Sequence, residues 1–72
     1  MKLPVISSRE CVSALQRAGF TIQRQNGSHI VMRHDDPYAL AVVPDHRPIK
    51  PGTLRNIIRQ AGLTVDEFVK LL

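Results

Sequence analysis

The Asn26-Gly27 pair is the feature that most restricts how this chain can fold. It lies between two short segments whose polar and apolar residues alternate, residues 20–25 (FTIQRQ) and 29–34 (HIVMRH). Such alternation is typical of β-strands with one buried face, and Asn-Gly between two alternating segments is a strong signal of a β-hairpin. The middle of the chain is therefore predicted to be two antiparallel strands joined by a tight turn.

The register of this hairpin decides which side chains share a face. A two-residue Asn-Gly loop would pair Ile22 with Val31, and it would mix polar and apolar side chains on both faces. A three-residue loop containing Gly27 instead segregates them, with one face holding Phe20, Ile22, Ile30 and Met32. The opposite face then holds Thr21, Gln23, His29, Val31 and Arg33. Because a slip of one residue moves every side chain to the other face, we predict the three-residue loop.

A helix is predicted before the hairpin, over residues 8–18. Ser7 and Glu10 have the S-x-x-E spacing of a capping box, which marks a helix N-terminus. Gly19 stands where a helix commonly ends on a left-handed residue. The apolar residues between these two signals recur at helical spacing: Cys11, Val12, Leu15 and Ala18.

Two further helices are predicted near the C-terminal end of the sequence. One begins at Gly52 or Thr53 and ends at Gly62. Its apolar residues follow the i, i+3, i+4, i+7 pattern: Leu54, Ile57, Ile58 and Ala61. Thr64 and Glu67 form a second capping box, which predicts a terminal helix through residues 65–72.

The remaining elements complete an α+β fold. Residues 35–37 (DDP) predict a turn, residues 39–43 a short third strand that is apolar on both faces, and residues 44–51 a proline-rich loop. The predicted order is α-β-β-β-α with a further short helix. We expect a three-stranded antiparallel sheet with the helices on one face, where they bury Phe20, Ile22, Ile30 and Met32. The other face stays open, and His29 lies on it.

The length of the chain limits what it can do. Seventy-two residues are enough for one domain, taken as residues 1–72, with a thin core. Any chemistry is therefore expected at the surface. The single cysteine, Cys11, lies on the apolar stripe of the first predicted helix, so we interpret it as a core residue. No segment resembles a signal peptide or a membrane span, which favours a cytoplasmic protein without membrane partners.

The charge balance favours a partner that carries phosphates. Ten Lys and Arg residues stand against six Asp and Glu, for a net charge of +4. A basic surface attracts nucleic acid over long range. Asp45 is the only acidic residue between positions 38 and 64, against the basic residues Arg47, Lys50, Arg55 and Arg59. A solvated, solubilising surface is the alternative interpretation of the same residues.

His29 is the residue best placed for chemistry. Motifs of nucleotide-binding loops, redox CxxC pairs and serine hydrolases are absent. An imidazole can take or give a proton at neutral pH, as RNA cleavage by its own 2′-hydroxyl requires. That reaction also needs donors for the phosphorane, which the amides near Gly27 and Ser28 and a nearby arginine could supply. The alternative is a solvated strand residue without a role.

The other two histidines have weaker claims. His46 lies in the loop PDHRPIKPG. Three interpretations of it are open: a second acid or base, a phosphate contact, or an ordinary polar residue. His34 is interpreted as structural. His29 and His34 point to opposite faces of one strand, and no other spacing fits a ligand pattern, so no metal or other cofactor is predicted.

The chain as a whole resembles the HicA toxin family of type II toxin–antitoxin systems. The resemblance is carried by LQRAGF (15–20), NGSHIVM (26–32), VVPDH (42–46) and KPGTLRNIIRQAGLTVDEF (50–68). It implies a double-stranded-RNA-binding-like fold and a metal-independent endoribonuclease that cuts mRNA and arrests growth. It also implies that His29, the histidine of GSH, is catalytic, and that a HicB-type antitoxin covers this surface. It assigns no catalytic role to His46.

Together, these observations predict an mRNA-cleaving toxin with His29 as general acid or base. The expected RNA contacts, chosen by charge and placement, are Arg24, Gly27, Ser28, Arg33, Arg47 and Lys50. A non-catalytic RNA-binding module of the same fold is the main alternative, because such folds also bind RNA by shape alone. A third possibility is an adaptor that binds only protein.

Overall fold

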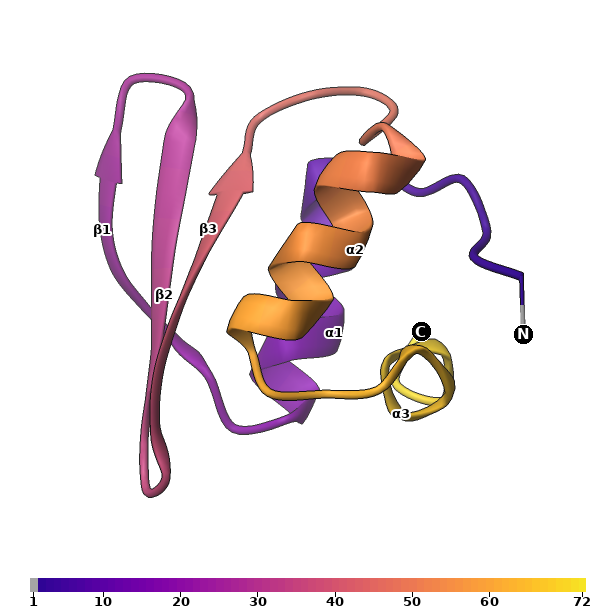
Figure 1. Cartoon of the computed structure of the whole chain (residues 1–72). Coiled ribbons are helices and arrows are strands. Elements are labelled where there is room, and N and C mark those ends of the chain that lie inside the picture. The colour runs from indigo at the N-terminus through magenta and orange to yellow at the C-terminus, as the bar shows by residue number, and fades with distance from the viewer. Residues whose placement is uncertain (1) are drawn as a thin grey trace.

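The computed structural model describes residues 2–72, with three helices packed on one side of a three-stranded sheet (Figure 1). The elements are α1 (Ser8–Arg17), β1 (Thr21–Asn26), β2 (His29–Asp35), β3 (Tyr38–Pro44), α2 (Pro51–Gln60) and α3 (Val65–Val69). The sheet is antiparallel with strand order β1-β2-β3. The α+β fold predicted from the sequence is confirmed, with its sheet open on the side away from the helices (Figure 1).

Both predicted capping boxes are formed. The Ser7 hydroxyl accepts from the Glu10 amide at 3.2 Å, and the Glu10 carboxylate accepts from the Ser7 amide at 3.0 Å. Thr64 and Glu67 make the same reciprocal pair at the start of α3. Each pair satisfies amides that a helix N-terminus otherwise leaves without a partner. These bonds place α1 and α3 where the S-x-x-E and T-x-x-E patterns predicted them.

The predicted three-residue hairpin loop is wrong. Asn26 pairs with His29, so the loop has two residues, Gly27 and Ser28. The extra residue is in β1 instead, where the register shifts between Ile22 and Arg24. Beyond this bulge Ile22 pairs with Met32, as the segregation of apolar residues predicted. A bulge and an odd loop restore the same register, so the polar and apolar pattern does not distinguish them.

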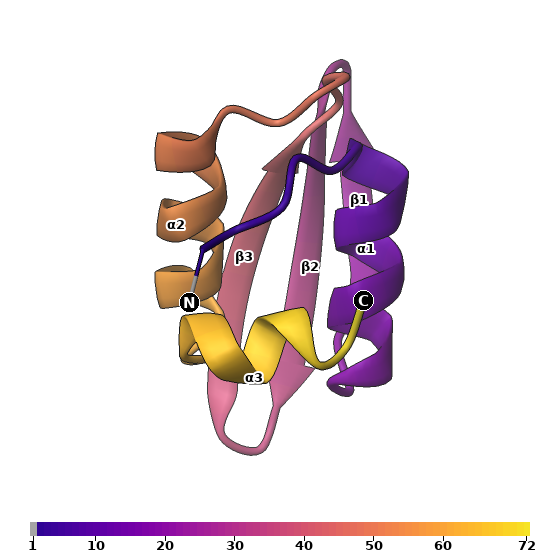
Figure 2. The ribbon, with the colours of Figure 1, turned by 90° about the vertical axis from the view of Figure 1, so that its right-hand side faces the viewer.

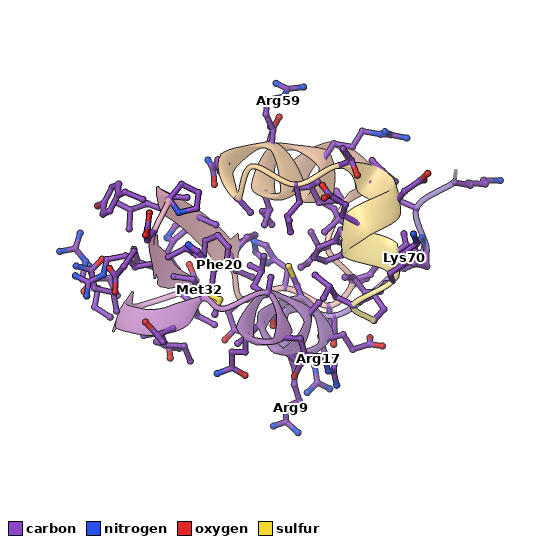
Figure 3. All side chains as sticks on the ribbon, turned by 90° about the horizontal axis from the view of Figure 1, so that it is seen from below. Arg9, Arg17, Phe20, Met32, Arg59 and Lys70 are labelled. Atoms are coloured by element: carbon purple, nitrogen blue, oxygen red, sulfur yellow. The ribbon has the colours of Figure 1, made fainter. Side chains whose placement is uncertain are left out.

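The core lies between the sheet and the helices. Phe20 and Met32 point into it beneath α1 (Figure 3), and Leu15, Leu54 and Phe68 are fully buried around them. The helix α3 lies across α1 and α2 on their far side from the sheet (Figure 2). The core cluster is Ile6, Cys11, Val12, Ala14, Leu15, Phe20, Met32, Ala41, Val43, Ile49, Leu54, Ile57, Ile58, Ala61 and Phe68.

The predicted burial of Ile22 under the helices is wrong. Its side chain is on the helix side of the sheet but remains 49% exposed, and Ile30 is only half-buried. Both line a groove of about 610 Å³ between α1 and the edge strand β1. The helix layer covers the centre of the sheet better than this edge, so a residue of the right parity can still be exposed there.

Gly19 joins α1 to β1 in a conformation that other residues rarely adopt. Its φ is +100°, and a Cβ built on it would lie 3.0 Å from Nε2 of His34. The His34 ring is held in that position by a 2.8 Å hydrogen bond between its Nδ1 and the Pro37 carbonyl. It also packs against the Phe20 ring, with centroids 5.2 Å apart. His34 is thus a structural residue, as interpreted from the sequence.

Replacing Gly19 with alanine is expected to lower the free energy of unfolding by about 1–3 kcal/mol, the usual cost of such backbone strain. The contact with His34 adds to this cost. Gly52→Ala is the matched control, because Gly52 lies in α2 with nothing within 4 Å of a built Cβ. Alanine there is expected to be neutral or stabilising by about 0.5–1 kcal/mol. Urea unfolding measures both, and equal stability of the two variants would contradict the strain at Gly19.

The helices of this fold are short. None of those formed between residues 2 and 72 is long and apolar enough to cross a bilayer.

Candidate active site

His29 is the first residue of β2 and lies beside the hairpin loop. Its position in the strand places it on the open face, because its neighbour Ile30 pairs with Val43 in the core layer. It stands across from Pro44 in the β2–β3 ladder. The side chain is exposed. The sequence prediction of an exposed imidazole on the open face is therefore confirmed.

His46 is brought to the same place by a backbone hydrogen bond. The Asp45 amide donates to the Ser28 carbonyl at 2.6 Å. His29 follows Ser28 and His46 follows Asp45. Each histidine is therefore the next residue after one partner of this hydrogen bond. The loop after β3 is thereby fixed against the hairpin turn.

The two histidines line one shallow depression of about 320 Å³. Its floor includes Val42 on the open face of the sheet, and one wall is the side of α2 that flanks β3. The rest of its lining mixes polar and apolar side chains: Val42, Pro44, Thr53, Asn56, Ile57 and Gln60. Among residues 2–72, His29 and His46 are the only titratable groups that line it. The arrangement can place a polar ligand beside two imidazoles, the side chains that most often act as general acids or bases.

The wall of the depression is tied to the sheet by Gln60. Its side-chain oxygen accepts from the Val42 amide at 3.1 Å. Val42 lies in β3, an edge strand whose outward amide would otherwise need water. This bond fixes α2 beside the strand and holds the Gln60 amide group at the depression. Thr53, Asn56 and Gln60 were not singled out from the sequence, because only the packing of α2 against β3 turns them toward His29.

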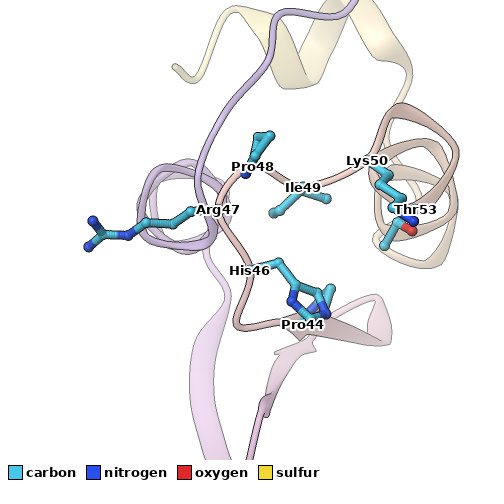
Figure 4. Close-up of a pocket in the computed structure, with 7 residues that line it drawn as sticks. All are labelled: Pro44, His46, Arg47, Pro48, Ile49, Lys50 and Thr53. Carbon is cyan, nitrogen blue, oxygen red and sulfur yellow. The ribbon is translucent and has the colours of Figure 1, made fainter.

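The predicted cations Arg47 and Lys50 lie on different sides of the same loop. Lys50 and Arg47 both line a second depression of about 520 Å³, which shares Pro44, His46 and Thr53 with the first. Figure 4 shows the Arg47 side chain extending away from His46 and Lys50, toward α1. Both cations therefore lie near His46, and Arg47 also borders the groove beside α1.

Arg24 and Arg33 lie on the open face of the hairpin. The bulge pairs Arg24 with Val31, two residues along β2 from His29. Arg33 is four residues from His29, about 13 Å at the usual rise of a strand. Its Nε makes a 2.9 Å ion pair with Asp35, which partly neutralises its charge. The structure therefore places Arg24 nearer the site than Arg33.

Gly27 and Ser28 form the turn that precedes His29. Gly27 has a φ of +54°, which a tight hairpin turn requires. Among the bonds formed by residues 2–72, the Ser28 carbonyl is used by Asp45, but the Gly27 and Ser28 amides have no acceptor. Two donors are thus available next to His29.

Other reactive side chains lie away from the depression. Cys11 is buried in α1, and its burial raises the pKa of the thiol to about 12, so the thiol stays neutral in the core. Across residues 2–72, no three His, Cys, Asp or Glu side chains lie together in a way that could hold a metal ion.

The model of a known protein family matches most of this chain. The sequence model of the HicA toxin of bacterial toxin–antitoxin systems aligns with residues 8–63, from the first residue of α1 to just beyond the end of α2. The chain belongs to the HicA toxin family. Both histidines of the depression fall within the region that matches HicA, whereas α3 lies outside it. No curated protein matches the chain significantly.

Proposed function

We propose that this HicA family member is a metal-independent endoribonuclease that cleaves mRNA, with His29 as general acid or base. The reaction is attack of the ribose 2′-hydroxyl on the adjacent phosphate, which needs proton transfer but no metal ion. The amides of Gly27 and Ser28 orient and stabilise the phosphate. Arg24, Arg33, Arg47 and Lys50 bind neighbouring phosphates, and their placement favours Lys50 and Arg24 over Arg33.

The observation that carries this proposal is the setting of His29. It is an exposed imidazole at the start of β2, with two unused amides before it and a depression partly lined by polar side chains beside it. Its ring makes no hydrogen bond with any of residues 2–72, whereas His34 bonds to Pro37. A histidine whose backbone is fixed in a strand, and whose ring makes no hydrogen bond within the fold, is available to bind a substrate.

The family also bears on the partners of the chain. A toxin of a toxin–antitoxin system has an antitoxin. We propose that a HicB-type protein is this antitoxin, that it covers the open face with His29, and that growth arrest in the cytoplasm ends when it binds.

Purified protein incubated with a defined mRNA and a chelator tests the proposal. Cleavage by wild type without divalent metal is the expected result. Intact mRNA that is nevertheless bound would favour the RNA-binding module, which should also be tolerated when expressed without an antitoxin. Failure to bind RNA at any salt concentration would favour a protein adaptor.

Lys50→Ala is expected to weaken RNA binding without changing its sequence preference. Removal of one phosphate contact should reduce the slope of log K against log salt by about 1. Lys70→Ala is the matched control, because Lys70 lies on the helical side of the molecule, away from the sheet (Figure 3). Fluorescence anisotropy with an uncleavable 2′-O-methyl RNA measures both slopes. The same slope for both variants would show that Lys50 does not contact RNA.

A further inference from the structure

We propose that His46 shares the proton transfers of RNA cleavage with His29, one imidazole acting as the base and the other as the acid. This inference rests on the proposed function, since it concerns the same depression. Neither the family match nor the sequence pattern assigns His46 a role in the chemistry.

The first support is that the fold places both histidines at one depression from separate elements. His29 begins β2 and His46 lies in the loop after β3. The Ser28–Asp45 hydrogen bond and the pairing of His29 with Pro44 join these segments. Both side chains line the same 320 Å³ depression. A substrate phosphate in it is therefore bordered by two imidazoles.

The second support is that the backbone of His46 is anchored while its ring is not. The His46 carbonyl accepts from the Ser8 amide at 3.2 Å, and its amide donates to the Pro44 carbonyl at 3.0 Å. The preceding Asp45 carboxylate accepts from the Ser8 hydroxyl at 3.0 Å. These bonds fix the loop to the start of α1. The His46 ring has no hydrogen-bond partner among residues 2–72, and in Figure 4 it lies over Pro44, on the side of the loop away from Arg47.

Two imidazoles match the two proton transfers of the reaction. The neutral imidazole removes the 2′-hydroxyl proton as the 2′-oxygen forms its bond to phosphorus. The bond from phosphorus to the 5′-oxygen breaks, and the imidazolium gives its proton to that leaving oxygen. The products are a 2′,3′-cyclic phosphate and a 5′-hydroxyl, and each histidine ends in the other's starting protonation state. Exchange of protons with water resets the pair.

The charged groups around His46 are few. Its own loop provides Asp45, Arg47 and Lys50, and β2 provides His29. The residues of α2 that face the depression are neutral: Thr53, Asn56 and Gln60. Ser8 is the α1 residue bonded to the loop, and it is neutral too. Because the proposed reaction needs one neutral and one protonated imidazole, kcat/KM should fall on both the acid and the alkaline side.

The test compares His29→Ala and His46→Ala with wild type on an mRNA fragment containing one mapped cleavage site. Each substitution is expected to lower kcat/KM by about 10²–10⁴-fold, the usual contribution of a general acid or base. Each variant should lose one limb of the pH profile. A second substrate carries sulfur in place of the 5′-bridging oxygen, because a thiolate leaves without being protonated. Only the variant that lacks the acid should recover activity on it.

The outcomes separate this inference from the proposed function. If wild type and His46→Ala cleave equally fast and with the same pH profile, while His29→Ala is inactive, the shared role is wrong but the endoribonuclease stands. If both variants recover on the sulfur substrate, or neither does, the division into base and acid is wrong. If wild type does not cleave, the proposed function itself fails. Thermal unfolding of His46→Ala and His46→Gln shows whether a loss of cleavage activity is accompanied by a loss of fold.

Discussion

Replacing His29 with alanine is expected to slow mRNA cleavage by about 10²–10⁴-fold while RNA affinity changes little. In the proposed mechanism the imidazole moves a proton in the transition state, whereas basic side chains and backbone amides provide most of the binding. Single-turnover cleavage and binding of an uncleavable RNA measure the two effects separately. In cells, the same variant should be tolerated without an antitoxin.

Thr21→Ala is the matched control for His29→Ala. Thr21 is an exposed residue of the same sheet, paired with Arg33 at the end of the hairpin opposite to His29. Its loss should leave both cleavage and binding unchanged. A His29→Ala protein that cleaves as fast as the Thr21→Ala protein would remove His29 from the mechanism.

Phe68→Ala is expected to have the largest effect on stability. The Phe68 side chain is 0% exposed and is one of the largest in the core. Truncation of a buried phenylalanine typically costs about 3–5 kcal/mol, because it removes apolar contacts and leaves a cavity. A domain of this length has a free energy of unfolding of about 4–11 kcal/mol. The variant is therefore expected to be marginally folded or unfolded at 37 °C.

This prediction also concerns the boundary of the domain. Phe68 lies in α3, beyond the part of the chain that matches the HicA family. Leu72→Ala is the control in the same segment, because Leu72 is 44% exposed, and its effect should be within about 0.5 kcal/mol. Chemical unfolding followed by circular dichroism measures both. If Phe68→Ala loses no more stability than Leu72→Ala, α3 is not part of the cooperative core.

Much of the fold could be predicted from the sequence because its signals are local. The capping boxes of Ser7 and Thr64, and the segregation of Ile22 and Met32 to one face, each involve residues close in sequence or paired across one turn. The hairpin loop was predicted wrongly because an odd loop and a bulge produce the same segregation. The difference matters for the proposed RNA contacts. Strict alternation from Ile22 would have placed Arg24 under the helices, whereas the bulge places it with Val31 on the open face.

The site could be predicted only in part, for a physical reason. His29 could be proposed from the sequence because strand parity and the GSH pattern both single it out. The association of His46 with His29 depends on a hydrogen bond between Asp45 and Ser28, which no local pattern indicates. Gln60 is at the site only because α2 packs beside β3, with its side chain bonded to Val42. The positions of His46 and Gln60 thus depend on contacts between distant segments of the chain, which local sequence patterns do not predict.

The chemistry of the RNA ends tests the central claim most directly. Purified wild-type protein should be incubated with a single defined mRNA and a chelator, and the fragment ends identified by mass spectrometry. Cleavage by the 2′-hydroxyl with histidine as the proton carrier predicts 2′,3′-cyclic phosphates, or the 3′-phosphates from their hydrolysis, together with 5′-hydroxyls. Fragments with 5′-phosphates and 3′-hydroxyls, formed only when a divalent metal is added, would contradict it.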